Sequence, residues 1–317
     1  MYVGPLLRSI RQTTDGSVRV LVVDNRSRDD SASTAENEIG RGSVVRLTEN
    51  LGFAYACNLG ARLATTEYVV FLNNDTLVGG SWLTALLQSM RDGEVAAACG
   101  KVLSLTDSSL LNSAGGLCDL FGFAWNRGNG EPDMGRYDRT DETFYAPGIC
   151  LAVRRDLFLR VGGFDESYFM YLEDLDCSWR LRLAGYRVVY TPESIIRHRW
   201  MSASKHRPDV TYLFHRNRLR TILKNHSSQT LSWILPVYVF LQVALSIWVI
   251  TRNRPQELIA ILRAIAWNLR QAKSTVIERR RAQSLRKVPD KEIMKHMYRG
   301  VAGILFALGR LRHPALV

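Results

Sequence analysis

The chain has 317 residues, of which 46% are hydrophobic and 23% are charged. This composition excludes an intrinsically disordered protein and fits one large domain, or one domain with an appendage. The five cysteines are scattered, odd in number and without a CxxC pair, so a disulfide framework and a cysteine-rich zinc site are both disfavoured.

The net charge of +12 is concentrated in one part of the chain. Residues 252–317 contain 15 Lys and Arg against 4 Asp and Glu, a charge of +11, whereas residues 1–251 contain 27 against 26, a charge of +1. A basic tail can bind nucleic acid or anionic lipid. This tail has no recognisable nucleic-acid-binding module and follows an apolar segment, so we expect anionic membrane lipid as its partner and no nucleic acid.

Segments typical of helices and of strands alternate along the first hundred residues. This alternation predicts a doubly wound α/β sheet with mostly parallel strands. The glycine-rich residues 104–147 are expected to form loops and a hairpin over the sheet edge, where they would shape a pocket. The expected order is a helix at 2–10, a strand at 18–23, a helix at 31–39, a strand at 44–47, a helix after residue 52, a strand at 69–77, a helix at 81–90 and a strand at 95–103.

Polar residues gather at the end of the apolar run VVFLNNDTL, residues 69–77. The run predicts a strand buried on both faces, and open α/β sheets bind ligands at the carboxyl ends of such strands. On a strand, Asn73 and Asp75 would share a face, and their oxygens suit a hard divalent cation that holds a phosphate. The same residues also fit a turn before the helix at 81–90, and the pattern alone does not decide between the two.

A second group of acids opens a helix predicted from about residue 171 to residue 185. Glu173, Asp174 and Asp176 lie in its first turns, where the backbone amides favour negative charge. Asp176 stands four residues before Arg180, which predicts an ordinary salt bridge. Asp174 has no such local partner and is expected to face elsewhere.

Four motifs in this order resemble family 2 glycosyltransferases, most closely the rhamnosyltransferase-like branch. They are VVDNxSxD at 22–29, NLGFAxAxNxG at 50–60, FLNNDT at 71–76 and RRDxFxxVGGFDExxFMYxEDxDxxxRxxxAGY at 154–186. The later FHRNRLRTILKNH at 214–226 also resembles that branch. The resemblance covers nearly the whole chain and implies a GT-A fold, which is a nucleotide-sugar-binding α/β domain with an acidic metal-binding motif.

The resemblance also implies roles for individual residues. Asp174 stands at the position of the catalytic base. His198 resembles a histidine that reaches the metal or the diphosphate, although a surface histidine between Arg197 and Arg199 is the alternative. Asn73 replaces the first acid of the usual Asp-x-Asp, which should weaken but not abolish binding of Mg or Mn. The implied metal ligands are Asn73, Asp75 and His198, and the implied substrate-binding residues are Asp24, Asn25, Asn50, Gly52, Asn58, Asn74 and Glu173.

These roles imply an inverting transfer of a sugar, with rhamnose as one candidate, from a dTDP- or UDP-linked donor to a lipid-linked or cell-envelope glycan. A metal would neutralise the leaving diphosphate, and one carboxylate would deprotonate the acceptor hydroxyl. A catalytically inactive relative that serves as a binding or scaffold protein is the alternative.

The sequence predicts a catalytic domain at 1–226 and a membrane-associating helical extension at 227–317. Residues 231–250 could form a helix of roughly 30 Å, enough to cross a bilayer core. Positive charge on both flanks favours a re-entrant or in-plane helix over a single crossing, and a buried core helix is a further alternative. A basic amphipathic helix is expected after it, with apolar residues at 258, 261, 262, 265 and 269, at the cytoplasmic face of the membrane.

A strand expected from the family is missing at the start of the sequence. In the family an apolar strand precedes the helix that corresponds to residues 2–10, and it lies centrally in the sheet. Loss of a central strand would leave two rows of backbone groups unpaired. We therefore expect that the natural product begins earlier, and that the start given is a misplaced initiation codon or that of a truncated fragment. The alternative is that the first strand is truly absent and that the chain is a non-catalytic remnant.

Overall fold

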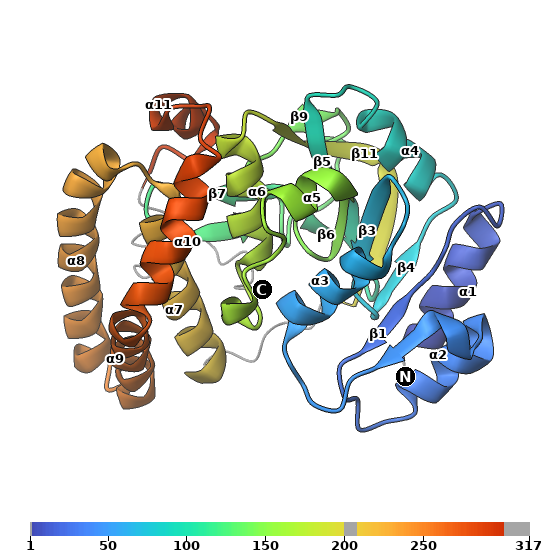
Figure 1. Ribbon diagram of the computed structural model, residues 1–317, viewed down its shortest axis with the longest axis horizontal. Coiled ribbons are helices and arrows are strands. Elements are labelled where there is room, and N and C mark those ends of the chain that lie inside the picture. Colours follow the sequence, from blue (N-terminus) through green and yellow to red (C-terminus); the bar gives the residue numbers. More distant parts are fainter. Residues whose placement is uncertain (1, 200–207, 301–317) are drawn as a thin grey trace.

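The structure is a computed structural model that describes residues 2–199 and 208–300. A mixed sheet lies in the middle of the molecule, with helices on both faces and a helical extension at one side (Figure 1). The helices of the first half are α1 (Val3–Thr13), α2 (Ser31–Ile39), α3 (Phe53–Leu63), α4 (Trp82–Ser89), α5 (Arg155–Arg160) and α6 (Glu173–Leu183), with short 3₁₀ turns at Arg41–Ser43 and Glu166–Tyr168.

The main sheet has the strand order β3-β10-β5-β11-β4, with β6 on β5 and β9 on β11. Among its described pairs of neighbouring strands, β5 and β11 form the one parallel pair and the others are antiparallel, so the prediction of a mostly parallel sheet is wrong. Strands covered on both faces read as continuous apolar runs whichever way they point, and the sequence pattern therefore cannot give their direction. The strands are β3 (Tyr68–Leu72), β4 (Thr76–Val78), β5 (Val95–Ser104), β6 (Leu111–Ser113), β9 (Asp141–Glu142), β10 (Cys150–Arg154) and β11 (Arg187–His198).

A separate parallel pair is formed by β1 (Val22–Asp24) and β2 (Val44–Arg46). Among the strands that the structure describes, neither β1 nor β2 pairs with the main sheet, and β3 is an edge strand of that sheet. The expectation of a further, central strand stays a prediction.

The predicted strand at 69–77 is divided by a turn, because residues 73–75 leave the extended conformation between β3 and β4. The hydroxyl of Thr76 closes the turn by donating to the carbonyl of Asn73 at 2.7 Å. β3 then pairs with β10, whereas β4 pairs with β11. The argument that Asn73 and Asp75 share a strand face is therefore wrong.

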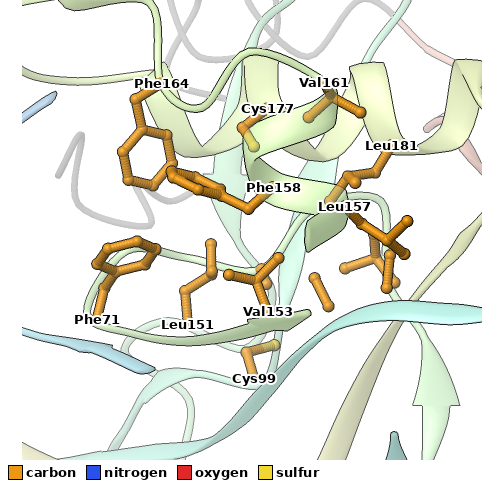
Figure 2. Packing of buried hydrophobic residues seen from close by; sticks show 14 of the residues in the cluster. Phe71, Cys99, Leu151, Val153, Leu157, Phe158, Val161, Phe164, Cys177 and Leu181 are labelled. Atoms are coloured by element: carbon orange, nitrogen blue, oxygen red, sulfur yellow. The ribbon is translucent and has the colours of Figure 1, made fainter. Parts of the chain in front are cut away.

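Two apolar clusters fill the space on either side of the sheet. Alternate residues of β10 point to opposite faces, so Leu151 and Val153 join one cluster and Cys150 and Ala152 join the other. Figure 2 shows the first cluster, in which the side chains of β10 meet those of α5 and α6. All five cysteines are free thiols, which agrees with the prediction from their number and spacing.

The segment at 104–147 forms loops with short strands, as predicted. Its hairpin consists of β7 (Gly116–Cys118) and β8 (Ala124–Asn126), which pair antiparallel. Helix α7 (Pro208–Asn225) ends just before the predicted boundary at residue 226. The described elements of the extension are α8 (Ser228–Thr251), α9 (Pro255–Arg270), α10 (Ala272–Ser284), α11 (Asp290–Ile293) and a 3₁₀ turn at Met294–His296.

The extension and the catalytic part share a core beyond the predicted boundary at residue 226. Ala282, Ile293 and Met297 pack with Tyr168 and Trp179 in one cluster. At the carboxyl end of α7, a side chain of α10 also binds the backbone, because the guanidinium of Arg279 donates to the carbonyls of Leu223 and His226 at 2.6 Å. A cut after residue 226 would therefore expose core surface.

Helix α8 lies at the outer edge of the molecule, beside α9 (Figure 1). It is long and apolar enough to cross a membrane, and only 22% of its most apolar window is buried. The alternative of a buried core helix is therefore wrong. On α9 the predicted stripe is split, because Ile261 packs inward while Leu262, Ile265 and Leu269 are exposed. The large apolar side chains exposed on α8 are Trp233, Val237, Val239, Phe240, Val243, Ile247 and Ile250.

Candidate active site

Asp75 and His198, which lie 123 residues apart in the sequence, meet at the ends of β4 and β11. The Oδ1 atom of Asp75 is 3.2 Å from Nε2 of His198. On the other side of the ring, Nδ1 of His198 is 2.7 Å from Oδ1 of Asn112, whose Nδ2 donates to Asn129. The orientation of Asn112 thus places a proton on Nδ1 of the histidine.

This tautomer has a consequence for the pair. In a neutral His198 the Nε2 atom carries a lone pair, so it would face a carboxylate oxygen at 3.2 Å without a hydrogen between them. The contact is favourable when a proton or a cation lies there. A carboxylate and an imidazole are both metal ligands, and the residues present therefore fit a divalent cation that takes its other ligands from substrate phosphates. The described residues contain no group of three or more His, Cys, Asp and Glu side chains that could hold a metal ion by themselves.

Three of the expected nucleotide-contacting residues form one hydrogen-bonded unit at the end of β1. The side-chain amide of Asn25 donates to Oδ1 of Asn50 at 3.0 Å, and its own oxygen accepts from the backbone of Leu51 at 2.9 Å. Oδ1 of Asn50 also accepts from the amide of Gly52 at 3.0 Å. Asp24 precedes Asn25 and accepts from the amide of Ser27. The unit holds the loop before α3 next to the end of β1.

Gly52 also lies against the segment that precedes the acidic helix. Its φ is +89°, and a Cβ atom there would come within 2.5 Å of the carbonyl oxygen of Phe169. That carbonyl accepts from the amide of Ala54. Any side chain at position 52 would push these two segments apart, which gives a physical reason for glycine in the NLGFA motif.

Asn58 is placed differently from its expected role beside the nucleotide. It is only 4% exposed, and its amide group donates to the carbonyl of Phe164 and to Glu166 while its oxygen accepts from the amide of Phe164. All three bonds join α3 to the segment before α6. The geometry gives Asn58 a structural function in place of a substrate contact. Asn74, by contrast, is exposed in the turn after β3.

Asp174 lies at the start of α6 and faces the short segment before β10. The amide of Gly148 donates to its Oδ2 at 2.8 Å. The next carbonyl, that of Ile149, accepts from the amide of Asn73. Gly148 and Ile149 therefore connect the candidate base to the turn that carries Asp75. Sequence reasoning missed Gly148, because no local pattern marks a glycine whose amide binds a distant carboxylate.

The electrostatic environment separates the two neighbouring acids. Burial raises the pKa of Asp174, and the amide of Gly148 opposes this only in part. Burial raises the pKa of Glu173 well above its usual range, and the charge of Asp174 raises it further. Oε2 of Glu173 is buried without a hydrogen-bond partner, which agrees with a protonated carboxyl. The pKa of Asp174 is thus raised less strongly than that of Glu173, and Asp174 is the acid of this pair that more readily becomes a carboxylate.

The loop before α6 has an unusual backbone that α7 holds in place. Phe169, Tyr171 and Leu172 all have positive φ, between 63° and 72°, at a cost of about 1–3 kcal/mol each. The buried side-chain amide of Asn217 donates to the carbonyls of Tyr168, Met170 and Tyr171, at 2.7 to 3.1 Å. Asn217 belongs to the FHRNRLRTILKNH motif, so this motif stabilises the loop that leads to Asp174.

A family model described as glycosyl transferase family 2 matches residues 2–162, half of the chain. The chain belongs to this family. The N-acetylglucosaminyl-diphospho-decaprenol L-rhamnosyltransferase of Mycobacterium tuberculosis is 32% identical over 215 residues, which cover 61% of this chain and 70% of that protein. The O-antigen chain rhamnosyltransferase WbaN of Salmonella anatum is 25% identical over 197 residues, 60% of this chain and 59% of that protein. These relatives confirm the rhamnosyltransferase-like branch.

Solved structures confirm the fold of this glycosyltransferase. The mannosyltransferase PcManGT of Pyrobaculum calidifontis, in complex with GDP-Man and Mn²⁺, has a TM-score of 0.51 at 19% identity, over 98% of this chain and 82% of that one. GalNAc-T7 with UDP, GalNAc and Mn²⁺ has a TM-score of 0.54 at 15% identity, over 69% of this chain and 44% of that one. At these identities the likeness concerns the GT-A fold alone.

Proposed function

We propose that this glycosyltransferase transfers a sugar, with rhamnose as the first candidate, from a dTDP- or UDP-linked donor to a lipid-linked glycan, with inversion at the anomeric carbon. The observation that carries the proposal is the connection of Asp174, through Gly148 and Ile149, to the turn that holds Asp75. A direct displacement needs a base for the acceptor hydroxyl close to the group that holds the leaving diphosphate. Gly148 and Ile149 contact both the candidate base and the turn of Asp75. The rhamnosyltransferase relatives support the sugar and the lipid-linked acceptor.

In this mechanism Asp174 accepts the proton of the acceptor hydroxyl as that oxygen attacks the anomeric carbon. Its raised pKa suits this task, because a base is most effective when its pKa approaches the working pH. The amide of Gly148 orients the carboxylate. The unit of Asn25, Asn50 and Gly52, with Asp24 beside it, would bind the nucleoside. The remaining assignments to Asn74, Glu173 and Asn73 stay predictions.

Asp75 and His198, with Asn73 on the same turn, would hold a divalent cation. When bound, Mg²⁺ or Mn²⁺ would neutralise the charge that develops on the leaving diphosphate. The Mn²⁺ in the two structural neighbours supports this expectation. Asn112 would keep Nε2 of His198 directed toward that position.

Replacing Asp75 by alanine is expected to remove metal-dependent transfer and to lower the rate about 100-fold or more, because the neutral side chain of Asn73 cannot supply the lost charge. Mn²⁺ binding, measured by electron paramagnetic resonance in the presence of nucleoside diphosphate, should weaken in parallel. Glu94→Gln, at an exposed carboxylate, is the control. Unchanged turnover with unchanged metal dependence in Asp75→Ala would contradict the metal assignment.

Helix α8 and the basic tail are expected to attach the protein to the cytoplasmic face of the membrane. The protein should sediment with membranes and need detergent for extraction. Because a cut at residue 226 would expose core surface, the sharper test is Phe240→Asp with Ile247→Asp on the exposed face of α8. A charge in the bilayer core costs about 2.5–3.5 kcal/mol, so this variant should move to the soluble fraction.

The control is Leu63→Asp, at an exposed apolar position on α3, which should stay with the membrane. Recovery of the unchanged protein in the soluble fraction after low-salt lysis would contradict membrane attachment. Release by high salt would identify the basic tail as the main anchor, because salt screens charge and not apolar insertion.

The decisive experiment for the proposed function is a donor screen. The protein with Mg²⁺ or Mn²⁺ is incubated with dTDP-rhamnose and UDP-sugars and with a polyprenyl-diphosphate-linked sugar, and release of nucleoside diphosphate and formation of product are measured. Transfer from one donor would support the enzyme, and its anomeric configuration would test inversion. No release from any donor would favour the inactive binding protein.

A further inference from the structure

A pocket opens between α7 and the hairpin of β7 and β8, next to the loop that leads to Asp174. Most of its wall is apolar, and one wall residue, Leu172, directly precedes Glu173 and Asp174. The aromatic ring of Phe214 in the wall stacks on Tyr171 of the same loop, with 4.8 Å between ring centroids. The pocket is thus built onto the segment that positions the candidate base.

One strong cation, Arg218, lines this apolar pocket. Its guanidinium lies over the rings of Phe123 and Tyr238, at 6.0 and 5.5 Å from their centroids. One nitrogen donates to Nδ1 of His215 at 3.1 Å, and the buried Nε has no hydrogen-bond partner. No carboxylate in the described part of the chain forms an ion pair with Arg218. A guanidinium that lies against aromatic rings and has donors to spare is a strong binder of phosphate.

The pocket also adjoins the apolar helix α8. Tyr238 of α8 contacts Arg218, and Gln242 of α8 donates toward His215. The opposite face of α8 carries the exposed apolar residues described above. A ligand in this pocket would therefore lie between the proposed membrane-facing helix and the loop of Asp174.

We propose that this pocket binds the phosphate-bearing end of a prenyl-diphosphate-linked acceptor. Arg218 holds phosphate oxygens, and the first prenyl carbons lie against Phe123, Phe214 and Leu172. The inference rests on the proposed function and adds to it the part of the acceptor that the enzyme recognises. An anionic phospholipid headgroup offers the same chemistry from another source, and the experiment separates the two.

The test uses the full chain in detergent with EDTA, so that the metal-dependent donor site does not bind the probe. Calorimetry measures binding of farnesyl diphosphate, farnesol and inorganic pyrophosphate. Farnesyl diphosphate should bind at least 10-fold more tightly than either of the others, because only it occupies both the apolar wall and the cation. Arg218→Met should weaken this binding at least 10-fold and leave binding of the nucleotide donor, measured with Mg²⁺, unchanged.

The matched control is Arg254→Met, since Arg254 also lies over an α8 ring, that of Trp248, at 5.5 Å. It should bind the probe as the unchanged protein does. If Arg218→Met fails to fold, Ala124→Leu tests the pocket by filling it, and the same loss of binding is expected.

Equal binding by Arg218→Met, or pyrophosphate binding as tight as that of farnesyl diphosphate, would overturn the proposal. Displacement of the probe by phosphatidylglycerol micelles at equal concentration would assign the pocket to phospholipid instead. Because the experiment measures binding and not turnover, it can still confirm or contradict the pocket proposal if the proposed transfer activity is not found.

Discussion

Asp174→Asn is expected to lower the transfer rate at saturating substrates by two or more orders of magnitude while donor affinity stays nearly unchanged. The amide oxygen can still accept from Gly148, but the side chain can no longer take a proton. Rates and donor affinities are measured separately, by steady-state kinetics and by calorimetry. Loss of donor affinity with a preserved rate at saturation would make Asp174 a binding residue.

The neighbouring acid provides the control. Glu173→Gln should lose less than about 10-fold, because its raised pKa keeps the carboxyl protonated and glutamine resembles that form. If Glu173→Gln lost as much activity as Asp174→Asn, the base would belong to the pair and not to Asp174 alone.

The pH dependence follows from the raised pKa of Asp174. The acidic limb of the rate profile should lie above the ordinary aspartate pKa of about 3.9, and Asp174→Asn should lack it.

The same raised pKa affects stability. The folded chain holds the proton of Asp174 more tightly than the unfolded chain, so ionisation of Asp174 reduces stability as the pH rises above about 3.9. Asp174→Asn should therefore unfold at the same or a higher temperature at neutral pH, which distinguishes loss of the base from loss of the fold.

Lys224→Met is expected to lower the free energy of unfolding by about 3–5 kcal/mol, because it leaves two buried carboxylates without their shared cation. Nζ of Lys224 donates to Asp165 at 2.7 Å and to Asp176 at 3.0 Å, and none of these three side chains is more than 8% exposed. Asp176 also forms the predicted pair with Arg180, at 2.8 Å. The network fastens α7 to α6 and to the loop of Asp165. Urea unfolding measures the change.

Lys295→Met is the matched control, since Lys295 pairs with Glu292 on the surface and both side chains are about half exposed. It should change the free energy of unfolding by less than about 1 kcal/mol. Similar losses for the two variants would show that the buried network contributes nothing beyond a surface pair.

Acid should reduce the difference between Lys224→Met and the unchanged protein. Burial by itself would raise the pKa of Asp165, but the charges of Lys224 and Arg220 outweigh it and hold that pKa well below its usual range. The stability that this carboxylate contributes is therefore present above the ordinary aspartate pKa and is lost as the pH falls below it. In the variant Asp165 keeps Arg220 and Asp176 keeps Arg180, and uptake of protons by the two carboxylates relieves the negative charge that Lys224 no longer balances.

The sequence by itself determined the family, the α/β class and the identity of the acidic motifs. It also predicted the pair of Asp176 and Arg180 and the exposed apolar helix. These features depend on local order, because helical spacing, apolar runs and short motifs are properties of neighbouring residues. The free cysteines follow from composition in the same way.

Only the tertiary structure decided the direction of the strands, the turn that divides residues 69–77 and the partners of the candidate residues. Asp75 meets His198 and Asp174 meets Gly148 because distant strands lie side by side, and no local pattern records such contacts. Asn58 shows the same limit, since its motif suggests a ligand but its buried amide is used up by Phe164. The extension joined the catalytic core for a physical reason that periodicity cannot show. Its helices bury apolar side chains against α6, and Arg279 of α10 donates to the carboxyl end of α7.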